Sequence, residues 1–230
     1  MNIKGKVKIG IVVLFSLVGV YLLAGTAVKY KNEESALSQK QEQQLRDAEE
    51  AKKRKEEEAK KQQEEQKKLQ EQKQAIDDKC NEAEKLFNKG SYKDAIAAAE
   101  NILKEDGQNV RALTIKGISL CYTRKTSGLD DINKALTIKP DYGYALYNMA
   151  LAYDIFWKYD EARVFYEKAL QAESEVEIKA LSNYYIAVID ARKGDINSAA
   201  KYLKAAVTID GNLSARADGD PLLSKIKLNQ

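Results

Sequence analysis

Residues 145–170 read ALYNMALAYDIFWKYDEARVFYEKAL, and this stretch decides the fold. Its first part carries the small residue Ala150 shortly before the bulky Tyr153, and its last part carries the small residue Ala162. Residues three or four positions apart lie on one face of a helix. The pattern predicts two helices joined by a short turn near Trp157.

The same arrangement recurs along the C-terminal part of the chain. The small residues that open each unit are spaced by 34, 33 and 37 positions: Ala83, Gly117, Ala150 and Ala187. A turn follows each of them, and the four turns span residues 88–91, 123–127, 156–158 and 192–195. A second helix with its own small residue comes next in each unit: Ala95, Gly128, Ala162 and Ala199. Self-similarity at such a period is typical of stacked helical repeats.

These units resemble the tetratricopeptide repeat (TPR), a pair of antiparallel helices A and B. In that family the two helices cross closely at small residues, which correspond here to Ala150 and Ala162. Aromatic residues fill the spaces beside the crossing, and the matching residues here are Tyr153, Tyr159 and Tyr166. The proline that ends many repeats of the family is present once, as Pro140.

The resemblance implies an all-α chain whose residues 76–230 form an α-solenoid of about four TPR-like helical hairpins. A single pair of helices cannot bury its apolar face, so at least three units must stack. The tail from Ser214 is expected to supply a C-terminal capping helix that begins with Asp220 and Pro221. Two departures from the family pattern leave the register of the second and fourth units open: Gly128 in place of Ala, and the polar residues Asn183 and Asp190 at positions that are usually bulky.

The resemblance also implies a partner-binding groove, because the inner surface of a TPR array is lined mainly by helix A. The family's inward positions fall on these residues: Phe87, Ile118, Tyr122, Tyr144, Tyr147, Asn148, Leu151, Tyr184, Tyr185, Val188 and Arg192. Tyrosine offers a broad contact area at low entropic cost together with a hydroxyl group, which suits a peptide groove. Two other interpretations stay open: several of these tyrosines are core residues, or a partner uses the convex face. The charged clamp with which some TPR proteins hold a terminal carboxylate is mostly missing at the matching positions.

Residues 1–28 are predicted to be an N-terminal membrane anchor. Residues 9–28 carry no charge, and about 20 apolar residues are needed for a transmembrane helix. Lys4, Lys6 and Lys8 precede this run, which predicts a single-pass protein with a cytoplasmic N-terminus and an extracytoplasmic C-terminal domain. A cleavable signal peptide, followed by secretion, is the main alternative. A buried core helix is a third.

Residues 29–75 are predicted to be a charged helical spacer. The segment has 13 basic and 12 acidic residues and neither Pro nor Gly. Acidic residues precede basic ones by four positions, which supports a helix by about 0.2–0.5 kcal/mol per pair. The pairs are Glu49–Lys53, Glu50–Arg54, Glu56–Lys60, Glu57–Lys61 and Glu64–Lys68. The leucines do not keep a heptad period, so a solvated single helix, a weak coiled coil and a frayed linker all remain possible.

Composition argues against several classes of function. Residues 76–230 contain 22 basic and 23 acidic side chains, so this part lacks the excess of positive charge that a nucleic-acid binder needs. The chain contains no histidine, which removes the commonest general base and metal ligand. Phosphate-loop, nucleophile-elbow and zinc-protease motifs are missing from the sequence, so we expect neither an enzyme nor a bound cofactor or metal. Cys80 and Cys121 are expected to be small core thiols, with a disulfide between them as the alternative.

These observations predict a membrane-tethered scaffold, of a bacterial type, that binds a partner protein or peptide through the concave face. Two alternatives stay open. In one, the chain is a structural subunit of an envelope assembly that self-associates through its spacer, and in the other it regulates a membrane complex.

Overall fold

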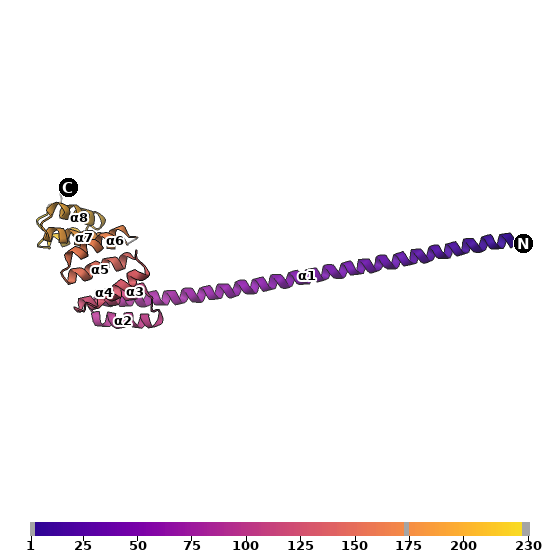
Figure 1. Ribbon diagram of the computed structural model, residues 1–230, viewed down its shortest axis with the longest axis horizontal. Helices are drawn as coiled ribbons and strands as arrows, with labels where there is room; N and C mark the ends of the chain where they lie inside the picture. Colours follow the sequence, from indigo (N-terminus) through magenta and orange to yellow (C-terminus); the bar gives the residue numbers. More distant parts are fainter. Residues whose placement is uncertain (1–2, 173–174, 227–230) are drawn as a thin grey trace. The chain divides into compact units, whose positions relative to one another are not determined.

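The computed structural model of the chain describes residues 3–172 and 175–226 (Figure 1). All the regular elements within these ranges are helices, which confirms the predicted all-α class for the part described. The chain divides into two compact units, Met1–Gln70 and Glu71–Gln230.

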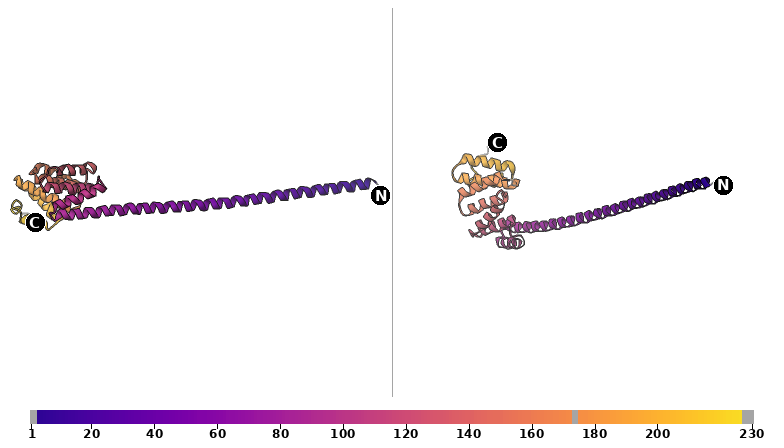
Figure 2. Two further views of the ribbon diagram at one scale, coloured as in Figure 1. Left: turned by 90° about the horizontal axis from the view of Figure 1, so that it is seen from below. Right: turned by 45° about the vertical axis from the view of Figure 1, so that its right-hand side comes forward.

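Helix α1 (Ile3–Asn88) contains the predicted spacer and runs without interruption (Figure 2). Every side chain from residue 29 to residue 75 is exposed, so tertiary packing does not hold this stretch helical. Local effects do: the residues have high helix propensity, and acidic and basic side chains meet across one turn. Glu50 and Arg54, one of the predicted pairs, lie 3.7 Å apart, and Glu42 and Arg46 lie 3.8 Å apart.

The N-terminal part of α1 is apolar. By length and composition, one helix in the described part of the chain is able to cross a membrane, and an 18-residue stretch of it has a mean hydropathy of 1.6. None of this stretch is buried within the protein; Phe15, for example, is 72% exposed. A buried core helix is therefore the one predicted alternative that the structure does not support. An anchor and a cleavable signal peptide both have this length and composition.

In the described part of the second unit, four helical hairpins are stacked in chain order and a short helix, α9, follows them (Figure 1). The last turns of α1 pair with α2 (Tyr92–Glu105), and α3 (Val110–Tyr122) pairs with α4 (Gly128–Ile138). The third and fourth hairpins are α5 (Gly143–Ile155) with α6 (Tyr159–Gln171), and α7 (Val176–Arg192) with α8 (Ile196–Ile209). The end of α1, α3, α5 and α7 are the A helices, and α2, α4, α6 and α8 are the B helices. The four predicted turns fall between A and B as expected.

The small residues predicted to mark the repeat lie inside the core. The alanines of the first, third and fourth hairpins have no exposed surface: Ala83, Ala95, Ala150, Ala162, Ala187 and Ala199. In the second hairpin both positions are glycine, and a Cβ atom on Gly117 would lie 2.6 Å from the carbonyl oxygen of Gly128. Gly128, which departs from the family pattern, therefore allows α3 and α4 to cross without an intervening side chain.

The turn from A to B has one left-handed residue in every hairpin. The φ angles are +78° at Gly90, +63° at Arg124, +59° at Trp157 and +83° at Gly194. Glycine adopts this conformation freely, whereas other residues pay a steric penalty. The two non-glycine residues contact each other: the Arg124 guanidinium lies 5.7 Å from the centre of the Trp157 ring and donates a hydrogen bond to the Ile155 carbonyl at 2.8 Å.

The polar departures in the fourth hairpin are satisfied in the core. Asp190 is 4% exposed and accepts hydrogen bonds from Arg163 Nε at 2.7 Å and from Ser198 Oγ at 2.6 Å. Asn183 donates to the carbonyl of Lys179 at 2.9 Å. Asp190 therefore links α7 to its neighbours α6 and α8 by hydrogen bonds. An apolar residue at that position could contact these helices only by packing.

The C-terminal cap differs from the prediction. The last helix within the described residues is α9 (Leu213–Asp218), before Pro221, and residues 221–225 form turns. The Asp220 carboxylate accepts a hydrogen bond from the Leu222 amide at 2.8 Å, so it caps a turn and not a helix. The buried side chains of Leu213 and Leu223 belong to one core cluster with residues of α7 and α8, so the tail still covers the end of the stack.

Both cysteines are free thiols in the core, as the first of the two predicted alternatives stated. Cys80 lies in the cluster of the first hairpin, and Cys121 lies in the large cluster that joins the second and third hairpins. Burial raises the pKa of Cys121 to about 12, so its thiol is protonated at neutral pH.

Candidate functional site

The A helices form the inner side of the stack. In the described part of the chain, α3 packs against α5 and α5 contacts α7, whereas α4, α6 and α8 do not contact one another to a comparable extent. Helices on the inside of a curved stack lie closer together than those on the outside. We call the side of the A helices that faces away from the B helices the inner face.

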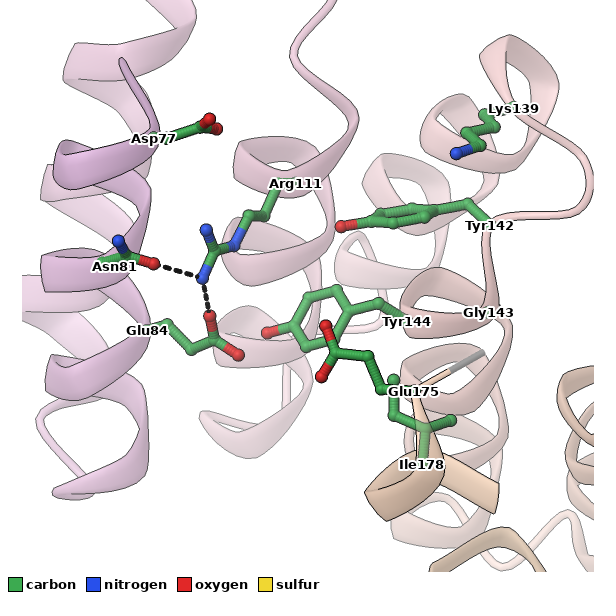
Figure 3. Close-up of a pocket in the computed structure, with 10 residues that line it drawn as sticks. All are labelled: Asp77, Asn81, Glu84, Arg111, Lys139, Tyr142, Gly143, Tyr144, Glu175 and Ile178. Atoms are coloured by element: carbon green, nitrogen blue, oxygen red, sulfur yellow. Dashed lines mark hydrogen bonds and ion pairs between the residues drawn. The ribbon is translucent and has the colours of Figure 1, made fainter. Parts of the chain in front are cut away.

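One end of the inner face contains a cavity of about 500 Å³ (Figure 3). All four hairpins contribute to it: the end of α1, α3, the turn before α5, α5 itself and the start of α7. We call it the polar cavity, and its lining residues are Asp77, Asn81, Glu84, Arg111, Lys139, Tyr142, Gly143, Tyr144, Glu175 and Ile178.

Arg111 organises the wall of the polar cavity that α1 and α3 share. Its guanidinium donates to Asn81 Oδ1 at 2.8 Å and forms a short ion pair with Glu84. Burial would lower the pKa of Arg111, but the hydrogen bond and charge of Glu84 keep it above its ordinary value. Arg111 is therefore already paired, and it fixes the geometry of the cavity instead of offering a free positive charge.

Two tyrosines form the opposite wall. In Figure 3 the hydroxyl groups of Tyr142 and Tyr144 point across the cavity towards Arg111 and Glu84. Burial raises the pKa of Tyr142 to about 12 and that of Tyr144 well above its ordinary value, so both hydroxyls are neutral hydrogen-bonding groups. Lys139 Nζ lies 5.2 Å from the centre of the Tyr142 ring, which positions the ammonium group at the cavity without neutralising its charge.

Two carboxylates of the polar cavity, those of Asp77 and Glu175, have no hydrogen-bond or ion-pair partner among the described residues. Of the two positive charges at the cavity, Arg111 is paired with Glu84 and Lys139 lies against the Tyr142 ring. The cavity therefore offers a partner two open acceptors, the Lys139 ammonium group and the Tyr142 hydroxyl.

A cluster of aromatic rings covers the part of the inner face nearer the A-to-B turns. Tyr122 is 38% exposed, stacks on Tyr92 with ring centres 4.8 Å apart, and contacts Phe87 edge-on at 5.4 Å. In the next hairpins Tyr185 stacks on Tyr166 at 5.5 Å, and Tyr147 lies within 6.4 Å of both rings; we call Tyr122, Tyr147, Tyr166 and Tyr185 the tyrosine cluster.

Two arginines near the tyrosine cluster, Arg192 and Arg216, make cation–π contacts with tyrosine rings. The Arg216 guanidinium is 4.7 Å from the Tyr184 ring and donates to the Tyr185 hydroxyl at 2.7 Å. Arg192 lies 4.7 Å from the Tyr159 ring. Such cation–π contacts hold the guanidinium groups in place with about 0.5–1 kcal/mol each at exposed sites.

The residues predicted from the sequence to form the groove fall into two groups. Seven have exposed or partly exposed side chains: Phe87, Tyr122, Tyr144, Tyr147, Tyr185, Val188 and Arg192. Four are core residues with at most 8% of their surface exposed: Ile118, Asn148, Leu151 and Tyr184. These four lie beneath the inner face and do not present a contact surface. Only one of them, Tyr184, is a tyrosine, so the alternative that several of the tyrosines are core residues holds for a single residue.

Several residues of the site were missed from the sequence. Arg111 and Glu175 lie at the start of α3 and just before α7, outside the positions to which the resemblance was applied. Glu84 has the same place in its repeat as Ile118, Leu151 and Val188, so the repeat spacing was a signal that could have found it. Tyr166 belongs to helix B of its hairpin, so a rule that assigns the inner surface to helix A could not include it.

Comparison with known proteins identifies the fold and no more. No family model and no curated protein matches the chain. Among solved structures, PilF of Pseudomonas aeruginosa matches with a TM-score of 0.57 at 15% identity, over 63% of this chain and 65% of PilF. PilW, described as a widely conserved type IV pilus biogenesis factor, matches with a TM-score of 0.52 at 23% identity, over 59% of this chain and 62% of PilW.

A chain of the APC/C hetero-tetramer Cut9–Hcn1 also matches, with a TM-score of 0.51 at 18% identity, over 61% of this chain and 25% of that one. The present chain thus spans less than two thirds of PilW and PilF. These structures are TPR proteins, and the helical hairpins of the second unit therefore form a TPR-like array.

Proposed function

We propose that this protein is a membrane-tethered scaffold that binds a segment of a partner protein on its inner face. Its structural neighbours are TPR proteins, which are typically scaffolds and not enzymes. The observation that carries the proposal is that α3, α5 and α7 carry partly exposed tyrosines and polar groups on their inner face, in the polar cavity and in the tyrosine cluster. Tyrosine and arginine are the residues that dominate binding energy at protein interfaces.

The chemistry of the inner face suits an extended peptide better than a small molecule. The polar cavity is formed by residues of four successive hairpins, and the tyrosine cluster by residues of at least three. A ligand that contacts both must reach across several repeats, which an extended chain does at about 3.3 Å per residue.

Site-specific photo-crosslinking in cells tests this proposal. The photo-reactive residue p-benzoylphenylalanine would replace Tyr122 or Tyr144 on the inner face, or Val164, which is 48% exposed on helix B α6, as the control. We expect the two inner positions to crosslink the same partner segment and the Val164 position to give no such product. Equal crosslinking from all three positions, or crosslinking from Val164 alone, would place the partner elsewhere.

The tether is proposed from the N-terminal part of α1, whose apolar side chains have no cover within the protein. An uncleaved anchor keeps the full-length protein in the membrane pellet after carbonate extraction, whereas a cleaved signal peptide releases a shorter, soluble product. The three lysines before the apolar run predict that an externally added protease digests the C-terminal domain without lysis of the inner membrane. If the C-terminal domain is digested only after lysis, the protein has the opposite orientation in the membrane.

A further inference from the structure

The lining of the polar cavity is almost entirely polar. Among its lining residues, Gly143 and Ile178 alone lack a polar side chain. The volume of about 500 Å³ lies within the range of about 300–1,000 Å³ that ligand-binding sites have, but such sites are usually lined mainly by apolar side chains. A ligand of the polar cavity must therefore offer hydrogen bonds, because an apolar one would leave the lining groups without partners.

The less exposed part of this lining is already paired. Arg111 donates to Asn81 and forms an ion pair with Glu84, and the side chains of Arg111 and Glu84 are only 27% and 25% exposed. Burial, the charge of Glu84 and a hydrogen bond to it raise the pKa of Tyr144. Because the two charges of this part cancel, it does not select the charge of a ligand.

The exposed part of the lining carries open charges of both signs. The carboxylates of Asp77 and Glu175 have no partner among the described residues, and Glu175 does not cap α7 with its side chain although it is the N-cap residue. Lys139 is also exposed, and its closest recorded contact is the Tyr142 ring, whose centre lies 5.2 Å from Nζ. Open acceptors and an open cationic donor therefore line the same cavity.

A ligand with a single charge meets repulsion in this cavity as well as attraction. A cationic side chain would face Lys139, and an anionic one would face Asp77 and Glu175. An uncharged amide group avoids both, since its NH2 group donates to a carboxylate and its carbonyl oxygen accepts from an ammonium group or a tyrosine hydroxyl. Hydrogen bonds in which one partner is charged are stronger than those between neutral groups.

We propose that the polar cavity binds an uncharged amide side chain, asparagine or glutamine, of the partner segment. Its NH2 group donates to the carboxylate of Asp77 or Glu175, and its carbonyl oxygen accepts from Lys139 Nζ or from the Tyr142 hydroxyl. The like charges of the lining exclude side chains with one charge, and such repulsive elements are a common source of specificity. This inference rests on the proposed function and specifies the residue that the segment places at this end of the inner face.

Fluorescent heptapeptide pools test this assignment against the full-length protein in detergent micelles. The central residue is glutamine, asparagine, glutamate, lysine or norleucine, the flanking residues are mixed and uncharged, and both termini are blocked. Fluorescence anisotropy measures the dissociation constant. Glutamate has nearly the shape of glutamine, so the difference between these two pools reports charge. We expect the glutamine and asparagine pools to bind at least about tenfold more tightly than the other three.

Two variants should shift the preference in opposite directions, which a merely structural role of these residues does not produce. Lys139→Gln leaves the carboxylates and should bring the lysine pool to within about threefold of the glutamine pool. The double substitution Asp77→Asn/Glu175→Gln leaves Lys139 and should do the same for the glutamate pool. All three side chains are exposed, so helix content by circular dichroism should equal that of the parent protein.

Lys125→Gln and Asp130→Asn are the matched controls. Both side chains are exposed and lie outside the polar cavity, and they carry the same charges as the residues under test. Neither control should change the order in which the pools bind.

Equal affinities for the glutamine, glutamate and lysine pools, no binding of any pool, or an unchanged order of the pools in both cavity variants would overturn the inference. A further pool with lysine and glutamate side by side in the centre represents a ligand with both charges. Tighter binding of this pool than of the glutamine pool would also overturn the inference. The proposed function fails separately, when Tyr122 and Tyr144 do not crosslink a partner in cells.

Discussion

Gly117 and Gly128 lie where α3 and α4 cross with no side chain between their backbones. A Cβ atom on Gly128 would lie 2.7 Å from Cys121 Sγ and close to the Gly117 carbonyl, and the backbone cannot move away without separating α3 from α4. Gly128→Ala should therefore destabilise the protein by about 1–3 kcal/mol, as overpacking does.

Urea unfolding followed by circular dichroism measures this change. Gly211→Ala is the matched control, because a Cβ atom at Gly211 would meet nothing within 4 Å and its φ angle is ordinary. The control should be neutral or more stable by about 0.4–1 kcal/mol, since alanine restricts the unfolded chain. Equal stability of Gly128→Ala and the parent protein would show that the crossing is looser than described.

The sequence predicts the roles of repeat residues well where the spacing of nearby residues specifies them. The alanine and glycine pairs and the A-to-B turns follow from their spacing alone. The groove positions were predicted less well, because adjacent residues on a helix differ by about 100° in direction: Tyr184 is 2% exposed, whereas its neighbour Tyr185 is half-buried and contacts the tyrosine cluster. Asp190 looked like a defect in the pattern because its partner Arg163 lies in another hairpin.

At the scale of elements, the ion pair between Arg163 of α6 and Asp190 of α7 couples the third hairpin to the fourth. Removal of one member of a buried pair leaves an uncompensated charge, and Arg163→Met should cost about 3 kcal/mol or more in the free energy of unfolding. Lys168→Met, on the exposed side of the same helix, is the control with a small effect. An equal effect of the two substitutions would mean that the pair contributes no coupling.

The ion pair between Arg163 and Asp190 also makes the free energy of unfolding depend on pH. Burial would raise the pKa of Asp190, but hydrogen bonds from Arg163 and Ser198 hold it below its ordinary value. A carboxyl group whose folded pKa is depressed stabilises the fold above its unfolded pKa, and this contribution is lost as the pH falls through the folded pKa. The free energy of unfolding should therefore fall below about pH 4, and Arg163→Met should show a shallower fall. A parallel pH profile of the two proteins would contradict this assignment.

The position of the C-terminal helix shows that local capping preferences do not decide where a helix forms. Asp220 followed by Pro221 is a good start for a helix, yet the chain forms its helix earlier, at α9, where Leu213 and Ala217 are buried against the last hairpin. Burial of apolar side chains on the exposed end of the stack outweighs the local capping preference, and the sequence alone does not reveal where that end lies.

At the scale of the whole molecule, each unit has its own source of stability. The helix of residues 29–75 is held by local interactions on fully exposed side chains, whereas the hairpins share clusters of buried residues that run from one repeat to the next. A repeat array of this kind leaves its inner face uncovered, because each hairpin buries its apolar surface against its neighbours. The proposed binding of a partner segment uses that uncovered face.

The most direct test of this account is the affinity of the full-length protein for a synthetic peptide with the sequence of the crosslinked partner segment. The double substitution Tyr122→Ala/Tyr185→Ala on the inner face should weaken binding by at least about tenfold, because tyrosine is enriched among the interface residues whose truncation costs about 2 kcal/mol or more. The double substitution Val164→Ala/Ile196→Ala, on exposed B-helix positions, should leave it unchanged, with helix content by circular dichroism equal in all three proteins. An unchanged affinity in the inner-face variant would contradict the central claim.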